Sequence, residues 1–258
     1  MADYIDIERA KTQSGLRLIL PPGRPNPWAE ALKGFCHVKK IPLTRVAKTP
    51  GHDAALQAWT SQSSAPVAIW NDERPRSTWT EQLYLVERLA PQPALIPDNI
   101  EDRTLLFGCA NELCGENGFG WSRRIMLVDG MVTNPQADEG TRTAASYLGG
   151  KYGYEQTAVA TAPARIAQIL QVFNARLEHQ RAKGSKFFLG NQLSALDIYW
   201  ATFAVLIQPL PPELCPIPEP LRASFTNTNP VIAAAATPAL LAHRDFIYRD
   251  YLQLPMDL

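Results

Sequence analysis

The chain has 258 residues, which is enough for one large or two ordinary domains with a buried core. Lysine plus arginine balance aspartate plus glutamate at 25 each, so the net charge gives no reason to expect nucleic acid or an anionic membrane as a partner. No stretch is apolar over membrane length, and the start MADYIDIERAKTQ is polar and mixed in charge. We expect a cytoplasmic protein whose ligand is a small molecule or another protein.

The cysteines indicate neither a metal site nor dithiol redox chemistry. None of them forms a C-x-x-C pair, and none has a histidine at metal-ligand spacing. We expect each to pack as a small hydrophobe in a reducing compartment, with no bound metal. They are Cys36, Cys109, Cys114 and Cys215.

The first third of the chain alternates strand and helix patterns. Residues 16–20 (LRLIL) form a short apolar run that ends at a Pro-Pro-Gly turn, which predicts a buried strand. Trp28, Leu32 and Phe35 then recur at helical spacing and predict an amphipathic helix. Next come a strand at 43–46, a weak helix or irregular segment at 54–59, a strand at 66–70 and a helix from residue 79. This order predicts an α/β domain.

The remainder of the chain is predicted to be helical. Residues 90–102 hold three prolines and are interpreted as a linker. Apolar residues at helical spacing predict helices around 105–113, 166–177 and 194–207. Segments 128–143 and 209–220 are expected to lie between helices, the second because it packs six prolines into twelve residues. We therefore predict an α/β domain over 1–92 and an all-α domain over 103–258.

The helix around 194–207 begins with a reciprocal cap. Ser194 and Asp197 stand three apart, so that each side chain can bond the backbone N–H at the other's position. Read alone, this predicts an ordinary buried helix. The longer pattern F-x-x-G-x-x-x-(S/T)-x-x-D, formed here by Phe187, Gly190, Ser194 and Asp197, resembles the C-terminal domain of glutathione S-transferases of the cytosolic, bacterial-like type. The resemblance implies a thioredoxin-like N-terminal domain followed by a helical-bundle C-terminal domain.

The turn after the first predicted strand carries the candidate catalytic residue. Asn26 is a favoured N-cap residue and Pro27 suits the first helical position, so a helix should start here. Its free N–H groups and positive end would point toward the turn, where an anion would bind. The segment is similar to the family pattern S-P-W-S-E-K, with Asn26 where many members place Ser or Cys, and nu-class members also place Asn there. The resemblance implies that Asn26 stabilises the glutathione thiolate, with Arg24 and Trp28 as nearby glutathione-binding residues.

An asparagine is chemically sufficient for that role. Lowering a thiol pKa from about 8.5 by roughly two units requires about 2.7 kcal/mol of preference for the thiolate. A hydrogen bond to a charged acceptor supplies roughly 1.5 to 3 kcal/mol and a helix N-terminus about 0.3 to 1 kcal/mol. The alternative is that Asn26 only caps its own helix. The two roles are compatible, because the amide oxygen accepts while the NH₂ group donates.

Two further segments resemble the glutathione-binding elements of the family. Ala65 and Pro66 begin a predicted strand, as in a motif whose proline is cis and whose preceding residue binds the cysteinyl part of glutathione. Ser77 and Thr78 stand where the family carries Glu-Ser or Gln-Ser for the γ-glutamyl carboxylate; the hydroxyl is kept and the acidic residue is missing. The alternatives are an ordinary strand-initial proline and plain helix capping.

The resemblance places a second substrate between the two domains. Candidates for the wall of that site are an aromatic pair, Phe119 and Trp121, and the adjacent arginines, of which Arg124 is preferred over Arg123. An apolar wall with a cation suits a hydrophobic electrophile. The alternative is that Trp121 is core and the arginines are surface residues. We expect the tail over 238–258 to lie against the α domain near this site.

The resemblance implies a homodimeric glutathione transferase of the detoxification type, conjugating glutathione, its co-substrate, to a hydrophobic electrophile. Two alternatives stay open. One is a non-catalytic binding or interaction protein of the same fold, favoured by the missing acidic and hydroxyl groups. The other is a glutathione-dependent disulfide reductase or lyase. No nucleic acid, membrane or metal partner is expected.

Overall fold

The computed structural model describes residues 3–49 and 53–258 and divides into two compact units. The first combines Met1–Pro97 with Leu210–Ile217 and Phe246–Leu258, and the second combines Asp98–Pro209 with Pro218–Asp245. Each unit is therefore built from segments that are distant in sequence, whereas the sequence suggested two contiguous domains.

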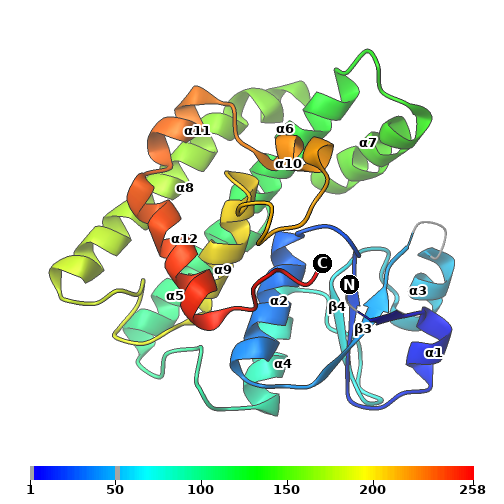
Figure 1. Ribbon diagram of the computed structural model, residues 1–258, viewed down its shortest axis with the longest axis horizontal. Coiled ribbons are helices and arrows are strands. Elements are labelled where there is room, and N and C mark those ends of the chain that lie inside the picture. The colour runs from blue at the N-terminus through cyan, green and yellow to red at the C-terminus, as the bar shows by residue number, and fades with distance from the viewer. Residues whose placement is uncertain (1–2, 50–52) are drawn as a thin grey trace. The chain divides into compact units, whose positions relative to one another are not determined.

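The first unit is a four-stranded sheet between helices (Figure 1). The strand order is β1 (Tyr4–Ile5), β3 (Leu43–Ala47), β2 (Leu16–Leu20) and β4 (Val67–Trp70), with β4 antiparallel to β2 and the other pairs parallel. The helices are α1 (Ile7–Lys11), α2 (Pro27–Val38), α3 (Asp53–Thr60) and α4 (Trp79–Leu89). This is the thioredoxin-like arrangement expected from the sequence.

The two faces of the sheet are covered by different helices. Ile19 of β2 and Val46 of β3 form one core cluster with Ile7 of α1 and Leu56 of α3. Because side chains alternate along a strand, the residues of β2 on either side of Ile19 point to the opposite face. Figure 1 shows α2 and α4 on that face, and α2 buries its Leu32 and Phe35. The buried side chains of α2 thus hold that helix against the sheet.

The sequence predicted the main elements of this unit and missed two small ones. β2, α2, β3, β4 and α4 lie where the sequence pattern placed them, and α3 fills the segment that was left open between a weak helix and irregular structure. β1 and α1 were not predicted, since a two-residue strand and a five-residue helix show no period. They form because β1 pairs with β3 and because Ile7 and Ala10 are buried.

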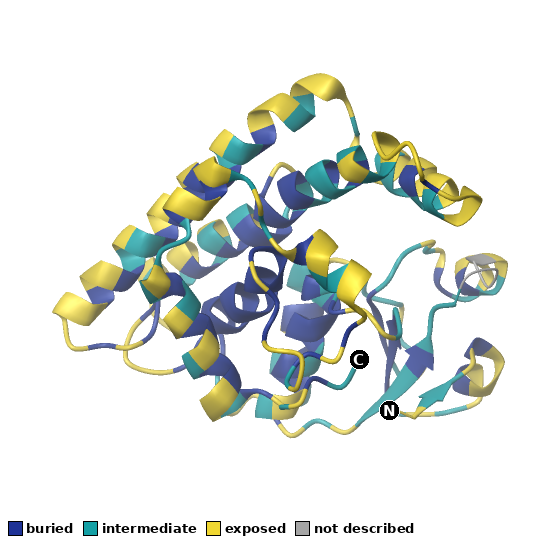
Figure 2. Cartoon of the chain, turned by 45° about the horizontal axis from the view of Figure 1, so that its top comes forward, coloured by how far each residue is buried: buried dark blue, intermediate teal, exposed yellow. Residues whose placement is uncertain are grey.

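The second unit is helical. Its helices are α5 (Ile100–Cys114), α6 (Phe119–Val132), α7 (Glu139–Tyr152), α8 (Gln156–Ala182), α9 (Ala195–Phe203), the short 3₁₀ helix η1 (Ala204–Leu206), α10 (Glu219–Phe225), α11 (Pro230–Ala235) and the first part of α12 (Pro238–Tyr251). Every residue of α9 is buried, and Figure 2 shows that helix dark along its length. The expectation that residues 128–143 lie between helices was wrong, because α6 runs to Val132 and α7 starts at Glu139.

The cap of α9 forms as predicted and is more extensive than the sequence indicates. Asp197 accepts the backbone N–H of Ser194 at 2.9 Å and its hydroxyl at 2.7 Å. It also accepts the N–H of Phe188 at 2.9 Å and Nε2–H of His243 at 3.0 Å. His243 lies on α12, so this fully buried carboxylate ties the start of α9 to a helix 46 positions away.

The expected docking of the tail over 238–258 on the helical domain is confirmed for residues 238–245 and wrong for Phe246–Leu258, which group with the first unit. The Asp257 carboxylate pairs with Arg45 of β3, and its carbonyl accepts from Lys33 of α2. Met256 N–H donates to Leu214 O at 2.7 Å, which joins the tail to the proline-rich segment. One ion pair and two hydrogen bonds thus join this end of the chain to residues distant in sequence, which the spacing of the tail residues could not predict.

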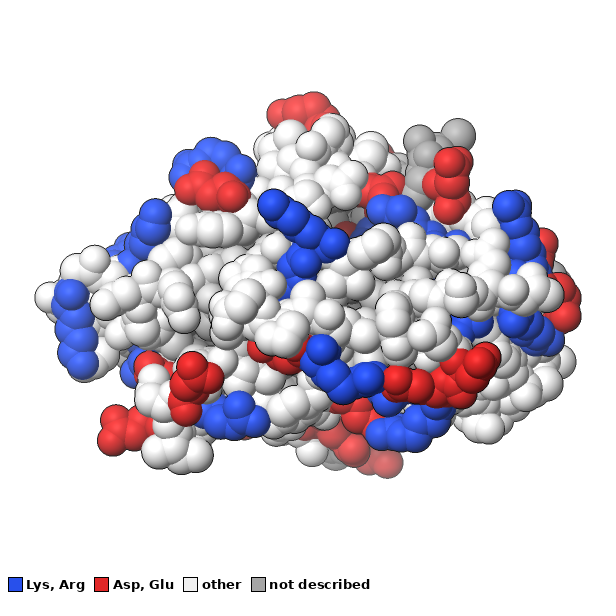
Figure 3. All heavy atoms as spheres, turned by 90° about the horizontal axis from the view of Figure 1, so that it is seen from below, with Lys and Arg blue, Asp and Glu red and all other residues white. Residues whose placement is uncertain are grey.

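Surface and cysteine chemistry agree with the composition. Basic and acidic side chains are interspersed over the face drawn in Figure 3 and do not form a patch of one sign. Within residues 3–49 and 53–258, no helix is both long and apolar enough to cross a membrane. All four cysteines are free, and three of them are buried.

Candidate functional site

The first element of the candidate site is the turn between β2 and α2. Gly23 adopts a φ of 68°, a left-handed conformation that glycine tolerates best, and the chain then reverses into Asn26. The side-chain oxygen of Asn26 accepts the backbone N–H groups of Trp28 at 3.1 Å and of Ala29 at 3.3 Å. Asn26 is therefore the N-cap, and Pro27 occupies the first helical position, both as predicted.

This cap uses the backbone donors that the sequence left free for an anion. Pro27 has no N–H, those of Trp28 and Ala29 bond the Asn26 side chain, and that of Glu30 bonds the Asn26 carbonyl at 2.8 Å. The expectation that free N–H groups at the start of α2 bind an anion was therefore wrong. Two features remain that can stabilise an anion at this turn: the dipole of α2 and the amide nitrogen of Asn26. Asn26 is half-buried, and its nitrogen donates to no residue that the structure describes.

The second element is the start of β4, which lies beside the end of β2. The Ala65–Pro66 peptide bond is cis, as the resemblance implied, and Val67 is in register with Ile19 of β2. Because β2 and β4 are antiparallel, the end of β2 that leads to Asn26 and the start of β4 at Pro66 lie at the same end of the two strands. The β2–α2 turn and Pro66 therefore converge.

The third element is the N-terminus of α4, held to the second by Gln82. The buried Gln82 amide donates to Pro66 O at 3.0 Å and to Arg76 O at 3.1 Å. Thr78, one turn earlier, is the N-cap of α4: its hydroxyl accepts the Glu81 N–H at 3.3 Å and donates to the Glu81 carboxylate at 3.0 Å. Gln82 thus brings the Ser77–Thr78 corner to the edge that carries Pro66.

Glu81 supplies a carboxylate next to Thr78, four positions after Ser77, where the family carries its acidic residue. It pairs with Arg74 at 2.7 Å. Burial tends to raise the pKa of Glu81, but hydrogen bonds from Arg74 and Thr78 outweigh it, so the pKa lies below its ordinary value and the group is ionised at neutral pH. The sequence signal for this contact is the T-x-x-E spacing from Thr78 to Glu81, which is a capping box.

The other predicted glutathione-binding residues occupy the same corner. Arg24 is exposed in the β2–α2 turn, Trp28 is half-buried in the first turn of α2, and Ser77 is half-buried just before the α4 cap. All of these, with Asn26, Ala65, Pro66 and Thr78, belong to the first unit. Gln82, which joins two of the three elements, was not predicted.

The predicted wall of the electrophile site has a mixed outcome in the helical unit. Phe119 is fully buried with its ring 6.5 Å from that of Trp200, which is a core position and argues against contact with a ligand. Trp121 is half-buried; its indole donates to Tyr152 O at 2.9 Å, and its ring meets the Tyr152 ring edge-on at 4.7 Å. Arg124 lies over the Phe225 ring at 5.5 Å.

Arg123 is structural. It is 4 % exposed and donates to Leu206 O at 2.7 Å and to Phe225 O at 3.4 Å, so it binds two segment ends together. Burial, with the nearby charge of Arg124, lowers the pKa of Arg123 to about 10. Trp121 and Arg124 stay predictions as substrate-contacting residues, and Tyr152 is the neighbour that the sequence did not suggest.

Three of the four thiols have raised pKa values. Burial raises the pKa of Cys36 to about 12 and also raises the pKa values of Cys109 and Cys114. A thiol with a raised pKa is a poor nucleophile at neutral pH. Among the described residues, no group of three or more His, Cys, Asp or Glu side chains could hold a metal ion.

Comparison with known proteins identifies the fold. Residues 156–245 match the family model "Glutathione S-transferase, C-terminal domain". A glutathione S-transferase from Methylobacterium radiotolerans, in complex with glutathione sulfonate, is 16 % identical with a TM-score of 0.62, covering 92 % of each chain. One from Methylobacillus flagellatus with glutathione bound is 13 % identical with a TM-score of 0.62, covering 91 % of this chain and 95 % of that one.

A eukaryotic structure gives the same result. Glutathione transferase Omega 3C from Trametes versicolor is 15 % identical with a TM-score of 0.58, covering 97 % of this chain and 94 % of that one. Comparison with curated protein sequences gave no match. Residues 156–245 thus match the C-terminal domain of glutathione S-transferases by sequence, and the chain shares the fold of the solved transferases over about nine-tenths of its length.

Proposed function

We propose that this protein is a glutathione transferase that conjugates the glutathione thiolate to a hydrophobic electrophile. The observation that carries the proposal is Asn26: its oxygen is occupied as the cap of α2, and its amide nitrogen is left as a donor at the positive end of that helix. The two bacterial structures with glutathione or its sulfonate bound support the choice of ligand.

The three elements suggest how glutathione would lie. The γ-glutamyl carboxylate would meet the hydroxyls of Ser77 and Thr78 at the start of α4, with the ammonium near Glu81. The cysteinyl backbone would pair with the backbone at Ala65. Its sulfur would then face the Asn26 amide, with Arg24 and Trp28 beside it. The hydrogen bond from the Gln82 amide to Pro66 O joins the start of α4 to the start of β4.

The reaction needs no nucleophile other than the sulfur of glutathione. The thiol loses its proton to water, and the Asn26 N–H and the α2 dipole favour the resulting thiolate. The thiolate forms a C–S bond with the electrophilic carbon, which either releases a leaving group with its bonding electrons or, in an addition, takes up a proton from solvent. No protein thiol takes part, in keeping with the raised cysteine pKa values.

Asn26→Asp is the sharpest test of this role. Aspartate keeps the cap, because its carboxylate accepts the same N–H groups, but it removes the donor and places a negative charge next to the sulfur. We expect the ultraviolet absorbance of the glutathione thiolate to be present at pH 7 in the wild-type complex and absent in Asn26→Asp, with an unchanged melting temperature. A thiolate signal that survives in Asn26→Asp would refute the assignment.

The alternative of a non-catalytic binding protein is favoured by one observation. The backbone donors of the first turn of α2 are all used within the protein, so less stabilisation is available for a thiolate than in a site with free N–H groups. This reading predicts that calorimetry detects glutathione binding while no electrophile in a broad panel is conjugated. Absence of glutathione binding at millimolar concentration would remove both functions.

The resemblance also leads us to propose a homodimer, with Trp121 and Arg124 contacting the electrophile. Sedimentation at micromolar concentration tests the dimer. Trp121→Ala tests the contact: it should raise KM for an apolar electrophile and leave KM for glutathione unchanged. Equal changes in both constants would indicate a general packing defect instead.

A further inference from the structure

Four ionisable side chains meet where the C-terminal tail docks on the first unit: Glu30 and Lys33 of α2, Arg45 of β3 and Asp257 of the tail. Lys33 pairs with Glu30 at 2.9 Å, and their side chains are 12 % and 9 % exposed. The Asp257 carboxylate pairs with Arg45. Because Val46 packs against α1 and α3, its neighbour Arg45 points to the opposite face of the sheet, which α2 covers. This charge cluster is therefore enclosed between α2, β3 and the tail.

Backbone contacts fix the tail at the charge cluster. The Lys33 ammonium donates to the carbonyl oxygen of Asp257 in addition to its pair with Glu30. The preceding residue, Met256, is buried, and its N–H donates to Leu214 O at 2.7 Å. Lys33 thus links the Glu30 side chain directly to the end of the chain.

Glu30 lies one helical turn after Asn26, the residue on which the proposed function rests. Its backbone N–H donates to Asn26 O at 2.8 Å, and residues four apart lie on the same side of a helix. A negative charge on Glu30 would repel a thiolate held by the Asn26 amide, and repulsion between charges is strong in a buried setting. Protonated Glu30 exerts no such repulsion. The protonation state of Glu30 therefore affects how readily glutathione ionises at Asn26.

Groups from four segments act on the Glu30 carboxyl. Burial raises the pKa of Glu30 to about 7, Lys33 on the same helix lowers it, Asp257 of the tail raises it, and Arg45 of β3 lowers it. Tyr4 of β1 is in register with Arg45, and burial raises the pKa of Tyr4 to about 12, so its phenol is uncharged at neutral pH. Asp257 therefore offsets the effect of Arg45 and lets Glu30 keep its proton.

We propose that Asp257 is a positioning residue of the glutathione site and acts through Glu30. By pairing with Arg45 it holds the negative charge of the cluster at β3, so that Glu30 stays protonated while the thiolate forms at Asn26. Without Asp257, the cations Lys33 and Arg45 favour the ionised form of Glu30, which releases its proton to solvent. The cluster then has the same total charge, but its negative charge lies on α2, one turn from the sulfur. Since the sulfur is placed at Asn26 by the proposed function, the role of Asp257 rests on that function.

The first measurement uses the full-length protein without glutathione. The carboxyl ¹³C resonance of Glu30, assigned by its loss in Glu30→Gln, is followed by NMR as a function of pH. Asp257→Asn should lower the pKa of Glu30 by about one unit, whereas Asp257→Glu, which keeps the charge, should restore the wild-type value. An unchanged pKa of Glu30 in Asp257→Asn would overturn the role of Asp257 and leave the proposed function standing.

The second measurement is the pH titration of thiolate absorbance in the glutathione complex. Asp257→Asn should raise the pKa of bound glutathione by roughly half a unit, about threefold in the ionisation constant. In the Glu30→Gln background the same change should not raise it, because no carboxyl group is left to take up the charge. An equal rise in both backgrounds would mean that the tail acts by packing alone, which overturns the role of Asp257. A wild-type complex without thiolate absorbance would overturn the proposed function and this role together.

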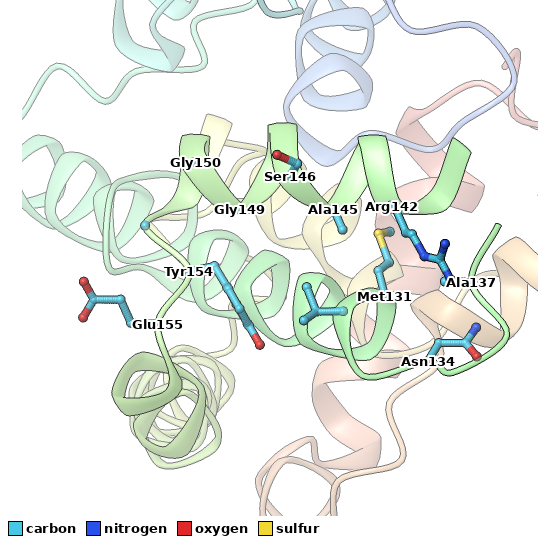
Figure 4. Close-up of a pocket in the computed structure, with 12 residues that line it drawn as sticks. Met131, Asn134, Ala137, Arg142, Ala145, Ser146, Gly149, Gly150, Tyr154 and Glu155 are labelled. Atoms are coloured by element: carbon cyan, nitrogen blue, oxygen red, sulfur yellow. The ribbon is translucent and has the colours of Figure 1, made fainter. Parts of the chain in front are cut away.

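Two other acidic residues provide matched controls. Asp250→Asn removes the acid of another Asp–Arg pair in the first unit, formed with Arg249 at 2.6 Å. Glu155→Gln removes one negative charge from the helical unit: Glu155 is exposed at the start of α8, and Figure 4 shows its carboxylate turned away from the other labelled residues. Both variants should leave the pKa values of Glu30 and of bound glutathione unchanged. If either control shifts them as much as Asp257→Asn, net charge and not the place of Asp257 decides the effect, and the role of Asp257 is overturned.

Discussion

Two helix N-termini in this protein use the same capping chemistry with opposite results. At α9, Asp197 is fully buried and accepts from four donors, all from the protein. At α2, Asn26 is half-buried, accepts from two backbone N–H groups and keeps its amide nitrogen as a donor. A cap whose groups are all satisfied internally stabilises the fold, whereas a cap that retains a donor can also bind a ligand.

The largest effect is expected at the satisfied cap. Asp197→Ala removes the buried acceptor of the Ser194 and Phe188 N–H groups and of His243 Nε2–H. We expect a loss of about 3 to 5 kcal/mol in the free energy of unfolding, measured from urea denaturation. Asn99→Ala, at the exposed cap of α5, is the control and should lose about 1 kcal/mol. Equal losses in the free energy of unfolding would mean that the buried cap and the exposed cap stabilise the protein alike, which would contradict this prediction.

A second prediction concerns the buried acid in the first turn of α2. Burial raises the pKa of Glu30 to about 7, against the attraction of Lys33 at 2.9 Å, with Asp257 raising it and Arg45 lowering it. The folded state therefore holds the proton more tightly than the unfolded state. Stability should fall as pH rises from about 4.5 to 7, by about 3 kcal/mol in total, and then level off.

Glu30→Gln isolates this contribution, because glutamine does not titrate. The free energy of unfolding is measured by denaturation at pH 5, 6, 7 and 8 for both proteins. The value for the wild type minus the value for the variant should fall as pH rises. A difference that does not change with pH would mean that Glu30 is ionised in the fold throughout.

The third prediction separates capping from ligand binding at Asn26. Asn26→Ala loses the cap and should lower the free energy of unfolding by about 1 kcal/mol, whereas Asn26→Asp should keep it. Both should raise the pKa of bound glutathione by at least one unit, since both lack the donor. Thermal melting and a pH titration of thiolate absorbance provide the two readouts. The opposite result is that the two variants differ in the pKa of bound glutathione and share one melting temperature. That result would contradict the assignment of capping to the Asn26 oxygen and of thiolate stabilisation to its nitrogen.

The smallest effect is expected at the α4 cap. Thr78→Ala removes the hydroxyl that accepts from Glu81 N–H, and we expect a loss of about 1 kcal/mol or less in stability. Its effect on KM for glutathione should be larger than its effect on kcat, because the group would touch the γ-glutamyl end and not the sulfur. Thr78→Ser is the control that should restore both values; a change in kcat alone would place Thr78 elsewhere in the reaction.

Much of the fold was predictable because its signals are local. The strand at Leu16–Leu20, the start of α2 at Pro27 and the α9 cap each follow from residues within four positions of one another. The helix α7 was missed because its sequence is polar and rich in glycine, and it depends on the Asp138 cap and on packing. The candidate site was predicted at Asn26, Pro66 and Thr78, but Gln82, which connects Pro66 to α4, was not.

The sequence by itself determined where the main strands and several helices lie, including the caps of α2 and α9, and which family the helical part resembles, since these depend on spacing along one segment. Only the tertiary structure decided that His243 completes the Asp197 cap, that Asp257 pairs with Arg45, and that the backbone donors of α2 are already used. The first two contacts join residues far apart in sequence. The third required the actual direction of a side chain, and it left the Asn26 amide nitrogen as the donor on which the proposed function rests.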